Sequence, residues 1–199
     1  MNLIGVTGTN GKTTVSYIVK KILDELGNSC SYLGTLGFMI NDEILSTGFT
    51  TPESLELHSM LKLIKSSGIN YSVMEVSSHS LDQYRVASIR FETAVFTNLT
   101  QDHLDYHENM ENYFNAKLKL FTNLDQDSYS VINIDDSYGR RLYKDINSNK
   151  ISYGFNNAAD IYSEKIKSSF TKTNCTISIF KESFEFESNL IGDYNILNI

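Results

Sequence analysis

The chain has 199 residues, 41% hydrophobic and 21% charged, so it can bury the core of one sizeable domain. Its net charge of −7 argues against broad nucleic-acid binding. The sequence shows no secretory leader and no apolar run long enough to span a membrane, and Cys30 and Cys175 stand in no metal or redox spacing. We therefore expect a cytoplasmic protein in a reducing compartment, by default a monomer.

The first predicted elements are a strand over 3–7 and a helix over 13–26, joined by a glycine-rich run. Strand, glycine-rich loop and helix form the context of a phosphate-binding loop, in which backbone amides and the helix N-terminus face phosphate oxygens. Lys12 would then reach the β- and γ-phosphates, and Thr13 would offer a hydroxyl to Mg²⁺. The run predicts binding of ATP or another nucleoside triphosphate.

This run departs from the general pattern G-x-x-x-x-G-K-[ST], because Val6 stands where the first glycine belongs and the extra glycines are Gly5 and Gly8. A glycine-rich turn that merely caps an ordinary helix is the alternative interpretation.

Apolar segments and amphipathic segments then alternate along the chain. Further strands are predicted at 30–34, 70–76, 93–98, 130–134 and 150–154. Further helices are predicted at 54–67, 111–124 and 137–147. This alternation predicts an α/β fold, a mostly parallel sheet flanked by helices over 1–155.

The pattern changes near the C-terminus, where residues 161–188 alternate apolar and polar, with a turn expected at 181–183. We expect a small antiparallel β region over 156–190 within one domain over 1–199. The pattern leaves open whether this region is a subdomain or an extension of the main sheet.

Three polar clusters follow predicted strands: Gly8–Thr14, Glu75–His79 and Asn98–His103. Ligands of open parallel sheets bind beyond the carboxyl ends of the strands, so these clusters should meet at one active site. Glu75 beside a phosphate loop is suited to holding Mg²⁺, although a surface carboxylate would look the same in the sequence.

The third cluster and the residues after it contain Asp102, His103, Asp105 and His107. Clustered histidine and aspartate indicate metal binding or acid–base chemistry, and they indicate equally a solvated loop with a helix cap.

Lys117 falls in the middle of an apolar helix face, whereas Lys119 points away from it. The other members of this face are Met110, Tyr113, Leu120, Phe121 and Leu124. A lysine is rarely buried without a partner or a function. A snorkelling lysine and a buried ion pair are the structural alternatives to a functional amine.

Two further segments carry polar side chains. Arg85, after Gln83, suits a carboxylate or phosphate ligand. Thr50 and Thr51 precede Pro52, and Thr51 is expected to be the N-cap of the following helix with Pro52 at its first position.

Taken together these motifs resemble the Mur ligases, the ATP-dependent amide-forming enzymes of peptidoglycan precursor synthesis. The run Thr7-Gly-Thr-Asn-Gly-Lys-Thr-Thr14 is similar to that family's nucleotide loop, which accounts for Val6. Further segments are similar to the MurE type of ligase: Thr50–Glu53, Glu75–His79, Gln83–Val86, Asp102–His107 and Tyr113–Phe121. The run Gly192–Asn198 is similar to the segment that closes the family's central ATPase domain.

The resemblance implies a role for each matching residue. Those implied to hold ATP are Gly8, Thr9, Asn10, Gly11, Lys12, Thr13 and Thr14, with Asn195 near the adenine. Those implied to contact the UDP-MurNAc-dipeptide are Thr50, Thr51, Ser77, Gln83 and Arg85. Thr13 and Glu75 would hold one Mg²⁺, Glu75 and His103 a second, and Lys117 would be carbamylated by CO₂ to give an anionic group near the second ion.

The resemblance also implies the reaction of an ATP-dependent acid–amino-acid ligase. The substrate carboxylate takes the γ-phosphoryl group of ATP, and an amine, of lysine or diaminopimelate, then displaces phosphate. The family's uridine-binding and C-terminal domains are not matched, so we expect a central domain that does not complete ligation alone. The alternatives are a folylpolyglutamate or cyanophycin synthetase-like ligase, another P-loop phosphotransferase or NTPase, and a non-catalytic ATP-binding module.

Overall fold

The computed structural model describes residues 1–40, 43–45, 50–180 and 182–199. The helices are α1 (Lys12–Glu25), α2 (Ser54–Ser66), α3 (Ser78–Asp82), α4 (Leu104–His107), α5 (Met110–Thr122), α6 (Ser137–Asp145) and α7 (Asp193–Ile196). The strands of the first half are β1 (Asn2–Thr7), β2 (Cys30–Gly34), β3 (Gly37–Ile40), β4 (Glu43–Leu45), β5 (Tyr71–Glu75) and β6 (Thr93–Phe96). The strands of the second half are β7 (Tyr129–Asn133), β8 (Asn149–Gly154), β9 (Ile161–Ser168), β10 (Thr173–Ile179) and β11 (Glu182–Ser188).

The strands of the described residues form a single sheet in the order β11-β10-β9-β8-β7-β6-β1-β5-β2-β3-β4. Neighbouring strands from β8 to β2 are parallel, and β3 and β4 add an antiparallel edge. The mostly parallel α/β fold predicted from the sequence is thereby confirmed. Because β1 lies between β5 and β6, the loop after β1 is flanked by the ends of both neighbours.

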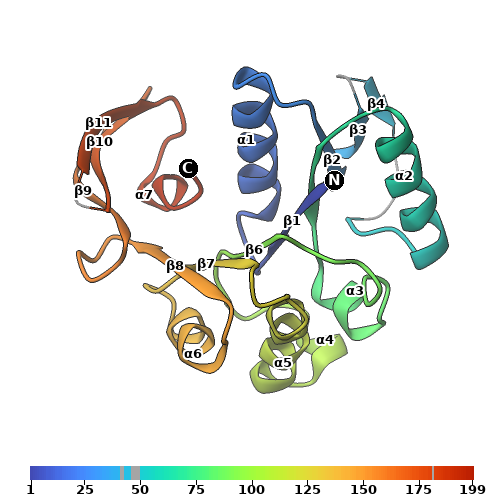
Figure 1. Ribbon diagram of the computed structural model, residues 1–199. Coiled ribbons are helices and arrows are strands. Elements are labelled where there is room, and N and C mark those ends of the chain that lie inside the picture. Colours follow the sequence, from blue (N-terminus) through green and yellow to red (C-terminus); the bar gives the residue numbers. More distant parts are fainter. Residues whose placement is uncertain (41–42, 46–49, 181) are drawn as a thin grey trace.

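Helices cover both faces of the central strands (Figure 1). On one face α1 packs its Val15 against Val6, Val73 and Val95 of the sheet. On the other face α2, α3, α5 and α6 bury the larger apolar cluster, in which Leu57 of α2 is fully buried. Burial on both faces explains why the central strands are continuous apolar runs.

The C-terminal β region extends this same sheet. β9 runs parallel to β8, which it meets at Tyr153↔Ile161, and β10 and β11 follow as antiparallel strands. The expected turn at 181–183 is wrong in part, since Glu182 belongs to β11 and pairs with Ile179. Lys181 lies outside the described residues. In the described part of the chain, no helix has the length and apolarity needed to cross a membrane.

Candidate functional site

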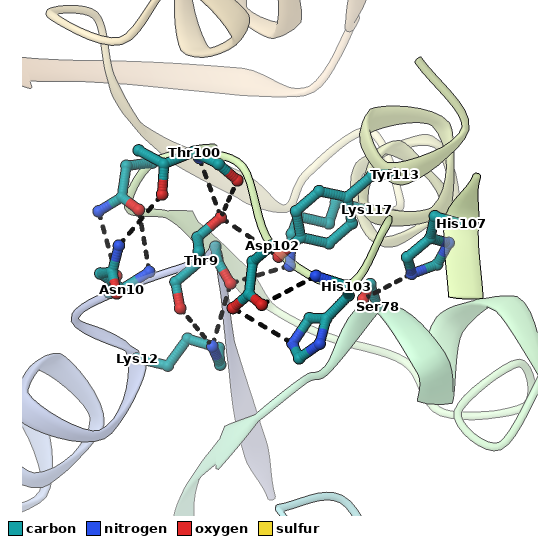
Figure 2. Close-up of polar contacts among 12 residues, drawn as sticks. Thr9, Asn10, Lys12, Ser78, Thr100, Asp102, His103, His107, Tyr113 and Lys117 are labelled. Atoms are coloured by element: carbon teal, nitrogen blue, oxygen red, sulfur yellow. Dashed lines mark hydrogen bonds and ion pairs between the residues drawn. The ribbon is translucent and has the colours of Figure 1, made fainter. Parts of the chain in front are cut away.

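The predicted phosphate-binding loop joins the end of β1 to the start of α1 (Figure 2). Gly11 has φ = 84°, in the left-handed region that favours glycine. A Cβ atom on Gly8 would lie 1.9 Å from Thr97 Oγ1, and one on Gly11 would lie 2.3 Å from Asn198 Oδ1. Both glycines are therefore required by close contacts with distant parts of the chain.

The loop is held by the segment after β6. The amides of Thr9 and Asn10 donate to Asn98, at its backbone oxygen and its Oδ1, both at 2.9 Å. Thr9 Oγ1 donates to the Thr100 carbonyl at 3.2 Å, and Thr97 Oγ1 donates to the Asn10 carbonyl at 2.6 Å. The first and third polar clusters predicted from the sequence thus lie side by side.

The backbone amides of the loop fall into two groups, those that donate to Asn98 and those at the N-terminus of α1. The amides of Thr9 and Asn10 donate to Asn98, whereas the first intrahelical bond of α1 joins the Val15 amide to the Gly11 carbonyl. The amides at 12–14 precede that bond and stand at the helix N-terminus, where anions are favoured. An anion would therefore bind most favourably at the first turn of α1.

Lys12 folds back onto its own loop. Its Nζ donates to the carbonyl oxygens of Gly8 and Thr9, at 3.0 and 2.9 Å. Burial lowers the pKa of Lys12, while the negative charges of Glu75 and Asp102 act in the opposite direction. The ammonium group is thus held at the mouth of the loop by neutral acceptors.

Lys117 is 1% exposed, on the apolar face of α5 as predicted. Its Nζ donates to the Gly8 carbonyl at 2.8 Å and lies 4.6 Å from the centre of the Tyr113 ring. The described residues place no carboxylate in an ion pair with it, and the amine does not reach solvent, so neither structural alternative applies. Burial lowers its pKa well below the ordinary value, and the charge of Lys12 adds to this effect.

Lys119, two residues further along α5, serves a different purpose. It forms an ion pair with Asp82 at 2.8 Å and lies over the ring of Tyr84, 4.8 Å from its centre. This agrees with its predicted position away from the apolar face.

Glu75 ends β5 and is fully buried. Its Oε2 accepts hydrogen bonds from Thr13 Oγ1 at 3.0 Å and from Thr35 Oγ1 at 3.1 Å. Its Oε1 accepts from the Thr35 amide at 2.9 Å and from the Tyr32 hydroxyl. The second cluster is thereby joined to the phosphate loop, and Glu75 is no surface carboxylate. Burial and the bond to Glu75 raise the pKa of Tyr32, so the phenol stays a neutral donor.

His103 occupies the N-cap position of α4 in a left-handed conformation, with φ = 52°. Its side chain is 45% exposed and lies 3.6 Å from the carboxylate of Asp102, and its ring meets that of His79 edge-on at 5.0 Å. Asp105 is exposed on α4. Figure 2 shows the imidazole of His103 beside the carboxylate of Asp102.

His107 differs from His103 in being buried. Its Nε2 lies 2.9 Å from Ser78 Oγ, and its ring stacks on Tyr113 with centroids 5.0 Å apart. Burial lowers the pKa of His107, and the charge of His79 acts in the same direction. His107 therefore joins α3, α4 and α5 and does not open onto the loop.

The expectation that Thr51 caps α2 is wrong. The N-cap is Glu53, and Pro52 precedes it outside the helix. Thr51 is buried, and its hydroxyl is satisfied there. Its Oγ1 donates to the Glu75 carbonyl at 2.8 Å and accepts from the Ser77 amide at 3.1 Å. Thr51 therefore fixes the segment before α2 to the end of β5.

The candidate substrate-contacting residues form a second group beside this segment. Arg85 Nη1 donates to the Thr51 carbonyl at 3.1 Å, and Nη2 forms an ion pair with Glu53 at 2.8 Å. Nη2 also donates to Gln83 Oε1. The Nε of Arg85 is buried without a hydrogen-bond partner among the described residues.

The remaining two candidates in this group make local contacts. Ser77 caps α3, where its Oγ accepts from the Ser80 amide at 3.1 Å. Thr50 Oγ1 lies 3.3 Å from Thr35 Oγ1, next to the donors of Glu75. The group thus reaches the carboxylate of Glu75 through Thr35.

Asn195 lies in α7 and bonds locally, with its Nδ2 donating to the Ile191 carbonyl at 2.8 Å. Its Oδ1 accepts from Asn198 Nδ2 at 3.2 Å, and Asn198 is the residue against Gly11. The structure therefore places α7 near the phosphate loop and adds Asn198 to the site.

The donor set suits a hard cation at one point, where the hydroxyl of Thr13 and the carboxylate of Glu75 meet. Within the described residues, no three His, Cys, Asp or Glu side chains are grouped to hold a metal ion, so the predicted set depends also on Thr13 and Lys117.

Sequence reasoning missed several residues of the site: Tyr32, Thr35, Thr97, Tyr113 and Asn198. Tyr32 carries the same apolar signal as a core residue, so nothing in the pattern marked it, and Tyr113 was predicted only as a member of the apolar face of its helix. Thr97 adjoins a polar cluster and Asn198 belongs to a segment that the sequence did single out, but neither was assigned a role in the site.

The parallel α/β sheet, with a glycine-rich loop leading from β1 into α1 and acidic and basic side chains at that edge, defines a P-loop-type α/β domain. Residues 6–199 match the family described as the Mur ligase middle domain. The chain belongs to the Mur ligase family.

Individual relatives agree with this assignment. The chain is 43% identical over 199 residues to the UDP-N-acetylmuramoyl-L-alanyl-D-glutamate–2,6-diaminopimelate ligase of Aquifex aeolicus, matching 100% of this chain and 41% of that protein. A solved structure of a ligase of that name superposes with a TM-score of 0.90 at 32% identity, covering 100% of this chain and 41% of the other. The chain thus spans about two fifths of the length of these relatives.

A more distant likeness shows the fold alone. The solved structure of a MurF ligase from Thermotoga maritima in complex with ADP gives a TM-score of 0.75 at 18% identity, covering 99% of this chain and 43% of that one.

Proposed function

We propose that the chain is the ATP-binding central domain of a MurE-type ligase, which adds diaminopimelate to UDP-MurNAc-L-Ala-D-Glu. The observation that carries this proposal is the meeting of Lys12, Lys117 and the Thr13–Glu75 pair around one glycine-rich loop. The activity for which the relatives are named supports the substrate and the amino acid, and a fold neighbour in complex with ADP supports the nucleotide.

In this function Lys12 binds the phosphates. Its ammonium group exchanges the carbonyl oxygens of Gly8 and Thr9 for the charged oxygens of the β- and γ-phosphates, which are stronger acceptors. The amides at 12–14 hold phosphate oxygens at the N-terminus of α1. Asn198 lies against Gly11 and bonds to Asn195, which supports a nucleoside position beside the α7 segment.

Thr13 and Glu75 would hold Mg²⁺, and Glu75 with His103 a second ion. When bound, the cations supply positive charge that offsets repulsion between the substrate carboxylate and the triphosphate. To bind the cation through its hydroxyl oxygen, Thr13 turns the hydroxyl proton away from Glu75. The neutral donors to Oε1 keep the carboxylate in place.

Lys117 is proposed to react with CO₂. Its unprotonated nitrogen attacks the carbon of CO₂, a nitrogen–carbon bond forms and one proton is released, so that a buried cation is replaced by a carbamate anion. Burial and the charge of Lys12 favour the neutral amine that this step needs.

The substrate is proposed to lie along Thr50, Thr51, Ser77, Gln83 and Arg85. The unpartnered Nε of Arg85 is a donor suited to an anionic group of the substrate. A carboxylate oxygen of the substrate attacks the γ-phosphorus, and the bond to the bridging oxygen breaks to release ADP. The incoming amine then attacks the acyl carbon, the bond from that carbon to the phosphate oxygen breaks, and the nitrogen loses a proton as phosphate leaves. The chain's contribution is positioning and charge stabilisation.

Calorimetry of the purified chain with Mg²⁺-ATP tests the nucleotide part of the proposal. Wild type and the surface control Glu92→Gln should bind alike, while Glu75→Gln should lose the dependence of binding on Mg²⁺. Equal Mg²⁺ dependence in all three proteins would contradict the assigned role of Glu75. Incubation with ATP and both substrates should give no tripeptide, and product formed by this chain alone would contradict the central-domain assignment.

A further inference from the structure

The two oxygens of Glu75 have different surroundings. Among the described residues, Oε2 accepts only from hydroxyl groups, those of Thr13 and Thr35, whose protons can rotate away. Oε1 accepts from the Thr35 amide, which is fixed in the backbone, and from the hydroxyl of Tyr32. Oε1 is thus the anchored oxygen and Oε2 is the one that can exchange a partner.

Tyr32 is suited to the anchoring role. It is fully buried in β2, which pairs in parallel with β5, the strand that ends at Glu75. The ring is therefore fixed by the sheet, and its hydroxyl reaches Oε1 from the strand next to the carboxylate. A buried carboxylate needs such donors, because water does not reach it.

Gly34 provides the space for this contact. A Cβ atom on Gly34 would lie 2.3 Å from Glu75 Oε1 and 2.5 Å from the Tyr32 hydroxyl oxygen. A side chain at this position would therefore separate the phenol from the carboxylate.

We infer that Tyr32 is a positioning residue for the cation site, holding Glu75 by Oε1 so that Oε2 faces Thr13 and the metal ion. The inference rests on the proposed function, in which Glu75 and Thr13 hold Mg²⁺. Tyr32 itself contacts neither metal nor substrate in this assignment.

The test uses Mn²⁺ as a spectroscopic probe, because it shares the preference of Mg²⁺ for oxygen ligands. Free Mn²⁺ is measured by electron paramagnetic resonance while the ion is titrated into the purified chain with saturating ADP. A hydrogen bond to a charged group accounts for about a tenfold change in affinity or more, so Tyr32→Phe should weaken Mn²⁺ binding by at least about tenfold. The affinity for ADP without metal should stay unchanged.

The matched control is Tyr153→Phe, which removes a phenolic hydrogen bond to the Phe96 carbonyl at 3.3 Å, away from Glu75. It should bind Mn²⁺ like the wild type. Unchanged Mn²⁺ affinity in a folded Tyr32→Phe protein would overturn the inference. Should Tyr32→Phe not fold, Gly34→Ala decides, because its added methyl disturbs the same contact, and a folded Gly34→Ala protein with wild-type affinity overturns the inference as well.

Glu75→Gln separates this inference from the proposed function. Loss of Mn²⁺ binding in Glu75→Gln without loss in Tyr32→Phe overturns only the role of Tyr32. Equal binding by wild type and Glu75→Gln overturns the proposed metal site and the inference with it.

Discussion

Lys12 and Lys117 donate hydrogen bonds to the same acceptor, the carbonyl oxygen of Gly8, at 3.0 and 2.8 Å. Two ammonium groups at one neutral oxygen repel each other, and burial removes the water that would screen them. Burial is the main cause of the lowered pKa of Lys117, and the charge of Lys12 adds to it. Lys12 thus places its amine at the mouth of the loop, whereas Lys117 keeps its amine buried beneath the loop.

The first prediction concerns Lys12. Replacement by alanine removes the ammonium group that would bind phosphate oxygens in place of the Gly8 and Thr9 carbonyl oxygens. We therefore expect at least about a tenfold loss of affinity for Mg²⁺-ATP. Isothermal calorimetry measures this loss, with the exposed Lys65 of α2, changed to alanine, as the control. Equal heats for wild type and Lys12→Ala would rule out a phosphate-binding role for the loop.

The second prediction concerns the stability of the chain as a function of pH. Because the folded pKa of Lys117 is lowered, the unfolded chain binds a proton that the folded chain does not, over the range between the two pKa values. Stability due to this residue therefore rises with pH toward the ordinary lysine pKa, near 10.5, and is reduced at neutral pH. Lys117→Met should stabilise the chain by about 1 kcal/mol or more at pH 7, and by less at pH 9.

Urea unfolding in CO₂-free buffer at the two pH values measures this difference. Lys119→Met is the matched control on the same helix, because that lysine is one-third exposed and paired with Asp82. A gain at pH 7 that is no larger for Lys117→Met than for Lys119→Met would contradict the prediction.

The third prediction concerns Gly11. Gly11→Ala combines a left-handed φ with a Cβ atom 2.3 Å from Asn198 Oδ1, whereas Gly27→Ala has a similar φ of 79° and no atom within 4 Å. The conformational penalty alone costs about 1–2 kcal/mol. We expect Gly11→Ala to lower the free energy of unfolding by about 1 kcal/mol more than Gly27→Ala, since the side chain of Asn198 must also move. Chemical denaturation of both variants gives the comparison, and equal losses would show that the Asn198 side chain moves at no cost.

The fourth prediction concerns His107. Its lowered pKa means that the unfolded state takes up a proton first as the pH falls below about 6.5, the ordinary histidine value. Stability is therefore lost as the pH falls from that value toward the folded pKa. His107→Gln, which keeps a partner for Ser78, should unfold with less dependence on pH between 5 and 7. Thermal melts at several pH values check this, with the exposed His58 changed to glutamine as the control.

The sequence predicted the central sheet to within a few residues, because strands buried on both faces are continuous apolar runs bounded by polar segments. It did not predict β3 and β4, which are short antiparallel strands after a tight turn. The helices α3, α4 and α7 were also missed, since segments of four or five largely polar residues read as loops.

The site was predictable where it followed from the fold, and not where it followed from packing. The edge at which Thr13 and Glu75 meet was expected because parallel strands end together. The helical period of the sequence alone predicts Lys117 on the buried face, where the structure has it. The bond from Thr51 to the end of β5 was not expected, because a threonine before a proline has an adequate local role as a helix cap.

Asn198 lies against Gly11, although the two are far apart in the sequence. Closing so long a separation is entropically costly, so we expect this contact to form after the central strands have paired. During synthesis Gly11 leaves the ribosome well before Asn198 exists. The nucleotide loop should therefore reach its final shape only after Asn198 is made, so that a chain interrupted before α7 can hold a complete sheet and an unfinished loop.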